Sequence, residues 1–286
     1  MGLSFMTNKK NLLFGGRIST CFVISILSII LLTSCASREG HSIIVAGSTS
    51  VQPYTEILAE EYAHLYPDRQ VDVQGGGSTA GITAARSGTA DIGMSSRSLK
   101  EGEEGLWFVE IALDGLAIIV NPENSLEDLT ISQVRSIYSA EVTKWSELGC
   151  IDSRIHVIAR EEGSGTRSAF EELVMGDNSI TPKAIVQDSN GAVRQLVADD
   201  PNAIGFISLG LVDHTVKALR LGGVTASVEN VMNGSYSLFR PFLFITNSQP
   251  EGLTEMFIEF TLADEGSRIM EKEGLIPVAG SEQKYE

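Results

Sequence analysis

Arg160 and the segment that follows it carry groups that could bind an anion. The stretch from Arg160 to Leu173 reads REEGSGTRSAFEEL, so glycines and hydroxyl side chains directly precede a helix-like pattern of apolar and acidic residues. Ser164, Gly165 and Thr166 would then lie at a helix start, where N–H groups lack intrahelical acceptors and the dipole favours negative charge. An arginine beside such a turn adds a charged, planar donor that fits oxyanions. The segment therefore predicts either an oxyanion site or an ordinary capped helix.

Two other segments have the same composition. AGSTSVQPY places Thr49 and Ser50 before one expected helix, and QGGGSTAGI places three glycines, Ser78 and Thr79 before another. Helix capping explains any one of these segments, because serine and threonine cap helices routinely. Three of them, with an arginine at the end of a strand, favour a shared oxyanion site, since glycine lets the backbone approach a ligand closely.

Motifs for nucleotide binding and for serine hydrolysis do not fit these segments. The 76–81 segment has the glycine spacing of a Walker loop, but Ile82 stands where that loop requires lysine. A nucleophile elbow at Ser164 would need glycines two positions before and after it, and neither is present. The dinucleotide fingerprint fails at both glycine clusters. A hydrolase that uses Ser164 or Ser50 stays an alternative, although no base is identifiable in the sequence.

Short β-rich runs alternate with helical periodicity along most of the chain. This alternation predicts an α/β fold with largely parallel sheets. Ligands of such sheets bind at the carboxyl ends of strands, which is where the three segments lie. The expected strands are 42–47, 71–74, 90–96, 116–121, 154–160, 202–209 and 240–247, and the expected helices are 51–66, 79–88, 131–139, 166–176, 190–200, 253–263 and 265–274.

The N-terminal segment is typical of an exported protein. Basic residues precede an apolar run over 18–32 that is shorter than the roughly 20 residues a membrane span needs. A secretory signal over 1–34 is therefore favoured over a transmembrane anchor. The run ends in LTSC, which resembles a bacterial lipobox. That resemblance implies cleavage before Cys35, lipidation of its thiol, and a short tether over 35–40.

The rest of the composition excludes some classes of function. Removal of 1–34 takes away three basic residues and no acidic ones, so the net charge falls from −16 to −19. The net charge of such an acidic chain repels nucleic acid instead of attracting it. Any bound anion must therefore be held by donors placed close to it. Cys150 is the one other cysteine left beside Cys35, so we expect no disulfide and a small, buried Cys150. The four histidines lack metal-ligand spacing, and we expect neither metal nor cofactor.

The sequence resembles the phosphate-binding subunit of bacterial phosphate ABC transporters. The matching segments are GSTSVQP, GGGSTAGI followed by ADIGMSSR, and REEGSGTRSAFEEL, in this order and at these separations. The likeness runs from about Ile43 to Pro277, and GSGTR is its most specific part. It implies a type II periplasmic-binding-protein fold, with two α/β lobes, two crossing segments and phosphate in the cleft. Lobe one would comprise 41–119 plus 241–286, and lobe two 120–240.

The resemblance also implies which residues hold phosphate. Arg160 would be the charged partner, and Glu162 stands where the family has an acidic residue that pairs with this arginine. Ser96 departs from the pattern, because many members have an aspartate there that accepts the proton of bound hydrogen phosphate. With serine at this position we still expect phosphate as the ligand, but we expect a different basis for its selection over other oxyanions. The phosphate ligands carried over are Thr49, Ser50, Ser78, Ser96, Arg160, Ser164, Gly165 and Thr166.

The function that the resemblance implies is transport without catalysis. A monomeric, lipid-anchored extracytoplasmic protein would capture inorganic phosphate by closing its lobes and deliver it to the permease of an ABC transporter. Binding of sulfate, molybdate or tungstate is an alternative, and so is a sensory role without transport. Competition among oxyanions separates the ligands, and binding without turnover separates a binding protein from a hydrolase.

Overall fold

The fold is that of a computed structural model, which describes residues 1–2, 42–278 and 284–285. All but two residues of the predicted signal peptide, the predicted tether and the lipidation site at Cys35 lie outside the described residues. Contacts divide the chain into the units Met1–Gly40 and His41–Glu286, and the second unit forms the fold. In the described part of the chain, no helix combines the length and the apolar character needed to cross a membrane.

The predicted strands and helices are present, with ends that shift by a few residues, but the sequence did not predict the strand Ile185–Gln187 or the helix Val228–Met232. The main difference is β4, which begins at Trp107 rather than at 116. The strands are β1 Ser42–Gly47, β2 Gln70–Gly75, β3 Ile92–Ser95, β4 Trp107–Val120, β5 Asp128–Leu129, β6 His156–Arg160, β7 Ile185–Gln187, β8 Ala203–Ser208, β9 Lys217–Ala218, β10 Arg220–Leu221, β11 Phe239–Thr246, β12 Ile276–Pro277 and β13 Lys284–Tyr285. The helices are α2 Gln52–Leu65, α3 Ser78–Ser87, α4 Ile131–Tyr138, α5 Gly165–Phe170, α6 Asn190–Asp199, α7 Val228–Met232, α8 Gly252–Leu262 and α9 Asp264–Lys272. The π-helix η2 Glu171–Met175 continues α5, and η1 Trp145–Leu148 and η3 Leu209–Leu211 are short 3-10 helices.

A mixed sheet runs through the second unit in the order β2-β1-β3-β11-β4-β8-β6-β7. β2, β1 and β3 are parallel, and so are β8, β6 and β7. β11 is antiparallel to both β3 and β4, and β4 is also antiparallel to β8. The prediction of parallel sheets is therefore confirmed within the two outer groups of strands and is wrong for the two strands between them.

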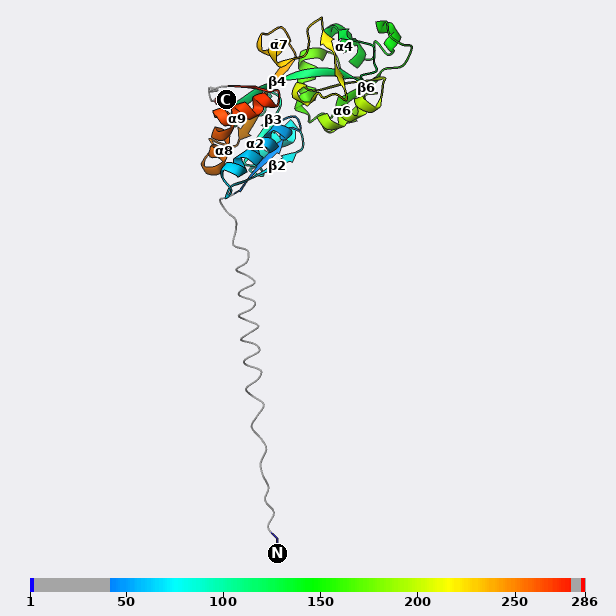
Figure 1. Cartoon of the computed structure of the whole chain (residues 1–286). Coiled ribbons are helices and arrows are strands. Elements are labelled where there is room, and N and C mark those ends of the chain that lie inside the picture. Colours follow the sequence, from blue (N-terminus) through cyan, green and yellow to red (C-terminus); the bar gives the residue numbers. More distant parts are fainter. Residues whose placement is uncertain (3–41, 279–283, 286) are drawn as a thin grey trace. The chain divides into compact units, whose positions relative to one another are not determined.

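β4 belongs to both halves of the sheet. Its first part, Trp107–Gly115, pairs with β11, and its second part, Leu116–Val120, pairs with β8. In Figure 1, α2, α8 and α9 gather with β2 and β3, α4 and α6 gather with β6, and β4 lies between the two groups. The antiparallel register places Arg240 of β11 directly opposite Asp114 of β4.

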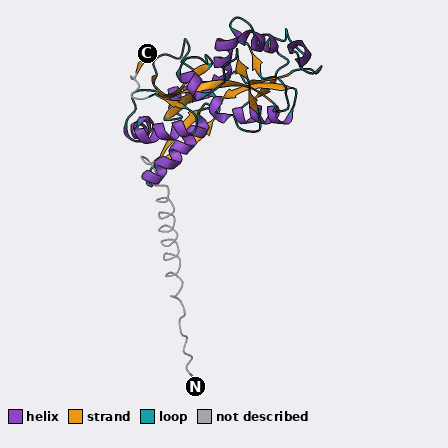
Figure 2. Ribbon diagram, turned by 45° about the horizontal axis from the view of Figure 1, so that its top comes forward, coloured by secondary structure: helices purple, strands orange, loops and turns teal. Residues whose placement is uncertain are grey.

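Alternating side chains on β4 and β11 supply the cores on both faces of the sheet. Successive residues of a strand point to opposite faces. On β11, Phe242 and Phe244 pack with α2 and α8, whereas Leu243 and Ile245 pack with α3. On β4, the even-numbered residues 116–120 join the cluster of α4 and α5, and the odd-numbered ones join that of α6. Helices therefore cover both faces of the strands, as Figure 2 shows.

Candidate anion-binding site

The three predicted segments meet where β1, β2 and β6 end. Thr49 follows β1, and its hydroxyl accepts a hydrogen bond from Nη2 of Arg160, the last residue of β6, at 3.0 Å. Ser50 Oγ lies 2.7 Å from Thr166 Oγ1 at the start of α5. The segment after β2 joins them through a backbone hydrogen bond from Thr79 to the carbonyl of Gly163 at 3.2 Å. Residues more than 80 positions apart in the sequence thus form one polar cluster, in which Ser50, Arg160 and Thr166 are buried.

Arg160 is a buried charged group of this cluster, and 1% of its side chain is exposed. Glu161 holds its Nε and Nη2 in a two-pronged ion pair, with both distances 2.9 Å. The carbonyls of Gln187 and Asp188 accept further hydrogen bonds from the same two nitrogens. Nη1 is buried and has no hydrogen-bond partner among the described residues. A buried, unpaired N–H group is costly, so the guanidinium is held in place with one donor end that an anion would satisfy.

Serine hydroxyls line the side of the cluster that faces α5. Ser96 is fully buried, and its Oγ accepts a hydrogen bond from Ser48 Oγ at 2.9 Å and lies 3.3 Å from Ser78 Oγ. The Ser96 amide donates to Ser78 Oγ at 3.0 Å. Gly165 packs against them so closely that an added Cβ would lie 2.3 Å from Ser78 Oγ and 2.5 Å from Ser96 Oγ. This position therefore admits only glycine without movement of the hydroxyls.

Helix capping explains one of the three segments and not the other two. Ser164 is the N-cap of α5, and its Oγ accepts a hydrogen bond from the Arg167 amide at 3.2 Å. α2 and α3 begin after Val51 and Gly77, and neither helix has a side-chain cap. The hydroxyls before α2 and at the start of α3 are therefore not used as caps. They hydrogen-bond to Ser96, to Thr166 and to Arg160 instead, which gathers donors at one place as an oxyanion site requires.

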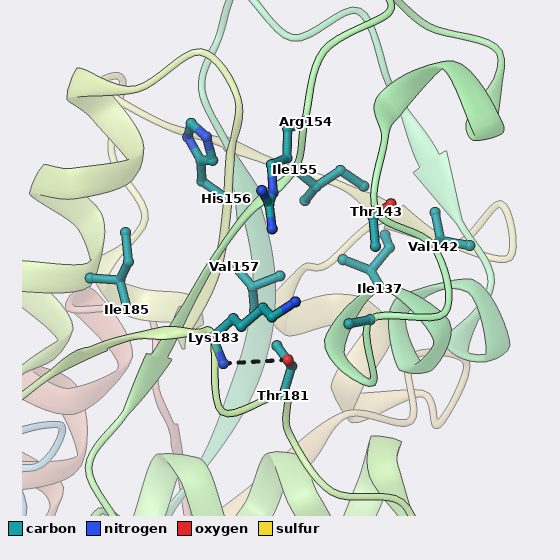
Figure 3. A pocket seen from close by; sticks show the side chains of 11 residues that line it. Ile137, Val142, Thr143, Arg154, Ile155, His156, Val157, Thr181, Lys183 and Ile185 are labelled. Carbon is teal, nitrogen blue, oxygen red and sulfur yellow. Dashed lines mark hydrogen bonds between the residues drawn. The ribbon is translucent and has the colours of Figure 1, made fainter.

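A separate pocket also contains cationic side chains, but they are exposed, unlike Arg160. Its volume is about 330 Å³, and the exposed cationic side chains of Arg154 and Lys183 lie at it beside apolar residues such as Ile137 and Val157 (Figure 3). Exposed cations hold an anion weakly, because water screens them. The pocket therefore lacks the buried, fixed donors that surround Arg160.

Comparisons with known proteins identify the family. A model of the PBP superfamily domain matches residues 34–265. Bacillus subtilis phosphate-binding protein PstS is 30% identical over 247 residues, which cover 84% of this chain and 82% of that protein. This chain belongs to the PstS family of phosphate-binding proteins.

Solved structures of family members share the fold. A Clostridium perfringens phosphate ABC transporter substrate-binding protein with bound phosphate superposes with a TM-score of 0.81 at 42% identity, covering 83% of this chain and all of that one. A Vibrio cholerae ABC-type phosphate transport receptor gives a TM-score of 0.70 at 39% identity, covering 82% of this chain and all of that one. The predicted type II periplasmic-binding-protein fold is confirmed, and the family consists of binding proteins and not of enzymes.

The hydrolase alternative has no support in the site. Ser50 Oγ has Thr166, Asn190 and Arg240 as partners, and Ser164 Oγ has the Arg167 amide. In the described part of the chain no histidine contacts either hydroxyl, so neither has the base that nucleophilic catalysis requires. The same residues contain no group of His, Cys, Asp and Glu side chains that could hold a metal ion.

Two expectations about neighbouring side chains are wrong. The ion-pair partner of Arg160 is Glu161, whereas Glu162 is exposed. The reason is local: Arg160 ends β6 and the chain turns at once, which brings the side chain of the very next residue back onto the guanidinium. Cys150 is partly exposed rather than buried, although it packs against the cluster of α4 and α5.

Besides Glu161, the sequence did not reveal three polar residues whose side chains contact the predicted ones. Ser48 donates to Ser96, and Asn190 and Arg240 both donate to Ser50 Oγ, at 2.7 and 3.1 Å. Arg240 in turn pairs with Asp114, and both side chains are at least 98% buried. Burial raises the pKa of the Asp114 carboxyl and lowers the pKa of the Arg240 guanidinium, so each ion depends on the other. The sequence did contain a signal for this pair, because Asp114 and Arg240 are charged residues within two otherwise largely apolar strands, β4 and β11.

Proposed function

We propose that the chain is an extracytoplasmic solute-binding lipoprotein that captures inorganic phosphate between two lobes and delivers it to the permease of an ABC transporter. The observation that supports this most is the buried Arg160, whose Nη1 has no partner among the described residues and which lies beside hydroxyls and a helix N-terminus from three loops. Such fixed donors in a water-poor site hold a multivalent oxyanion far better than exposed cations do. The bound phosphate of the Clostridium perfringens relative supports the choice of ligand.

The proposed ligands come from both lobes. We place the lobes at 41–119 plus 241–286 and at 120–240. Closure would then bring the hydroxyls of lobe one against Arg160 and the start of α5 in lobe two, as the Thr49–Arg160 and Ser50–Thr166 contacts suggest. The ligand set we propose is Thr49, Ser50, Ser78, Ser96, Arg160, Ser164, Gly165 and Thr166.

A competition titration tests the ligand. Purified protein is titrated with phosphate by calorimetry, alone and in the presence of sulfate, molybdate or tungstate. We expect phosphate to bind without turnover and the other oxyanions to displace it only at much higher concentration. Displacement by sulfate at equal concentration would assign the protein to another oxyanion.

The Ser96→Asp variant tests the basis of selectivity. Phosphate near neutral pH still carries a proton and sulfate does not, so a carboxylate can accept from phosphate and repel sulfate. Serine can accept that proton but adds no repulsion. Because Ser96 Oγ is buried beside Ser48 and Ser78, we expect Ser96→Asp to widen the ratio of sulfate to phosphate dissociation constants. Binding should also become more dependent on pH, because the new acceptor can itself be protonated.

The matched control is Ser98→Asp, which adds the same charge two positions away at an exposed residue. It should leave the competition ratio unchanged. If Ser96→Asp also leaves the ratio and the pH profile unchanged, Ser96 does not contact the anion, and selectivity against sulfate comes from another acceptor.

The lipid anchor is tested at Cys35. We propose that a lipid on Cys35 holds a monomeric binding protein at the membrane beside the permease. Cys35→Ser should release the protein into the soluble fraction with phosphate affinity unchanged, because Cys35 precedes the folded unit. Cys150→Ser is the control and should stay in the detergent phase. A Cys35→Ser protein that still partitions into detergent would exclude the lipobox.

A further inference from the structure

Ser50 Oγ is part of a closed ring of buried polar side chains. Arg240 Nη2 donates to it at 3.1 Å, and Asn190 Nδ2 donates to it at 2.7 Å. Arg240 also binds Asp114 Oδ2 through Nε and Nη2 at 3.1 and 3.0 Å. Ser208 closes the ring, because its Oγ donates to Asp114 Oδ1 at 2.7 Å and its amide donates to Asn190 Oδ1 at 3.3 Å. All five residues are buried.

Counting protons and lone pairs fixes what the Ser50 hydroxyl can do. A serine hydroxyl has one proton to donate and two lone pairs that accept. Arg240 and Asn190 have only N–H groups to offer at these contacts, so both lone pairs are occupied. The proton must therefore be donated, and the group in reach is Thr166 Oγ1 at 2.7 Å. An anion oxygen bound between these loops is a stronger acceptor than a threonine hydroxyl.

We propose that Arg240 and Asn190 are positioning residues that make Ser50 an obligate hydrogen-bond donor to the bound phosphate. A hydroxyl without fixed partners can either accept or donate a hydrogen bond, and it reorients when the ligand binds. A hydroxyl whose lone pairs are already filled is preorganised toward a deprotonated phosphate oxygen. The protonated oxygen of hydrogen phosphate is then directed away from Ser50, toward hydroxyls such as Ser96 that can still accept.

The ring also ties this donor to both halves of the sheet. Asp114 and Arg240 lie opposite each other on the antiparallel strands β4 and β11, and Ser50 follows β1. Asn190 begins α6 and Ser208 ends β8, so both belong to the other half. In the proposed closure, Asn190 reaches Ser50 only when the lobes are together. Ser50 is thus fixed as a donor in the closed state, which adds to the preference of phosphate for that state.

A double-mutant cycle tests whether Asn190 acts through Ser50. We expect Ser50→Ala to weaken phosphate binding about thirtyfold and Asn190→Ala about tenfold, the usual range for a hydrogen bond to a charged group. If Asn190 acts through Ser50, the double variant should bind no more weakly than Ser50→Ala alone. A residue that only supports the fold would weaken both backgrounds by the same factor.

Asn121→Ala is the matched control. Asn121 is also a buried asparagine, but its amide binds the carbonyls of Val197 and Ala198 instead of Ser50. It should lower the melting temperature without changing phosphate affinity. Arg240→Met combined with Asp114→Asn gives a second, independent cycle with Ser50→Ala. This combination avoids burying an unpaired carboxylate, which would destabilise the protein.

Because the role of Ser50 rests on the proposed phosphate-binding function, the outcomes are chosen to separate the two. Absence of phosphate binding in the unaltered protein would overturn the function itself. Phosphate binding that Ser50→Ala leaves intact, or factors for Asn190→Ala that are equal in both backgrounds, would overturn the positioning role alone. Loss of the Asn190 effect in the Ser50→Ala background supports it.

Discussion

Arg160→Ala should nearly abolish phosphate binding while the protein stays folded. Arg160 is buried and charged, and its Nη1 has no partner among the described residues. Loss of a charge-assisted contact in such a site costs about 2–5 kcal/mol. That corresponds to a loss of affinity of roughly 30- to several-thousand-fold. Calorimetry with phosphate measures the loss, and the absence of a phosphate-induced rise in melting temperature confirms it independently.

Removal of Arg160 also leaves Glu161 without its partner, but that carboxylate is partly exposed and water can solvate it. Arg154→Ala is the matched control, because Arg154 is an exposed arginine at the pocket of Figure 3. It should keep full affinity. A change below tenfold for Arg160→Ala would remove Arg160 from the site and leave it as a structural partner of Glu161.

Gly165→Ala should weaken phosphate binding through a single methyl group. The added Cβ would lie 2.3 Å from Ser78 Oγ and 2.5 Å from Ser96 Oγ, which is closer than atoms can approach. Overpacking of this kind costs about 1–3 kcal/mol. We therefore expect roughly 5- to 150-fold weaker binding. The methyl would separate α5 from the hydroxyls that the closed site requires, so the melting temperature without phosphate should change little.

Gly191→Ala is the control for this variant. Gly191 also lies in the first turn of a helix, α6, but a Cβ there meets no atom within 4 Å. Alanine should stabilise that helix slightly and leave affinity unchanged. If Gly165→Ala binds phosphate as well as Gly191→Ala does, the hydroxyls of Ser78 and Ser96 can turn away without loss and are not ligands.

Local patterns in the sequence were enough to predict most of the helices and strands and the residue types of the site. Hydrophobic periodicity depends on neighbours a few positions away, so it located the helices and strands well. The Gly, Ser and Thr segments are also local, and they predicted that donors would lie at helix starts after strands. The apolar run at 116–121 predicted a buried strand, yet the start of β4 at Trp107 was missed, because polar residues such as Glu110 and Asp114 interrupt the pattern there.

Tertiary structure alone decided which partners those residues have. Arg240 and Asp114 are 126 positions apart, and only the antiparallel register of β11 on β4 places them opposite each other. Asn190 is 140 positions from Ser50, and it reaches that hydroxyl because α6 begins beside the end of β8. Burial then fixes the direction of each hydrogen bond, since a polar group removed from water must use the partners that packing supplies. Residue types therefore set the chemistry that is available, whereas packing of distant strands determines which hydroxyl donates.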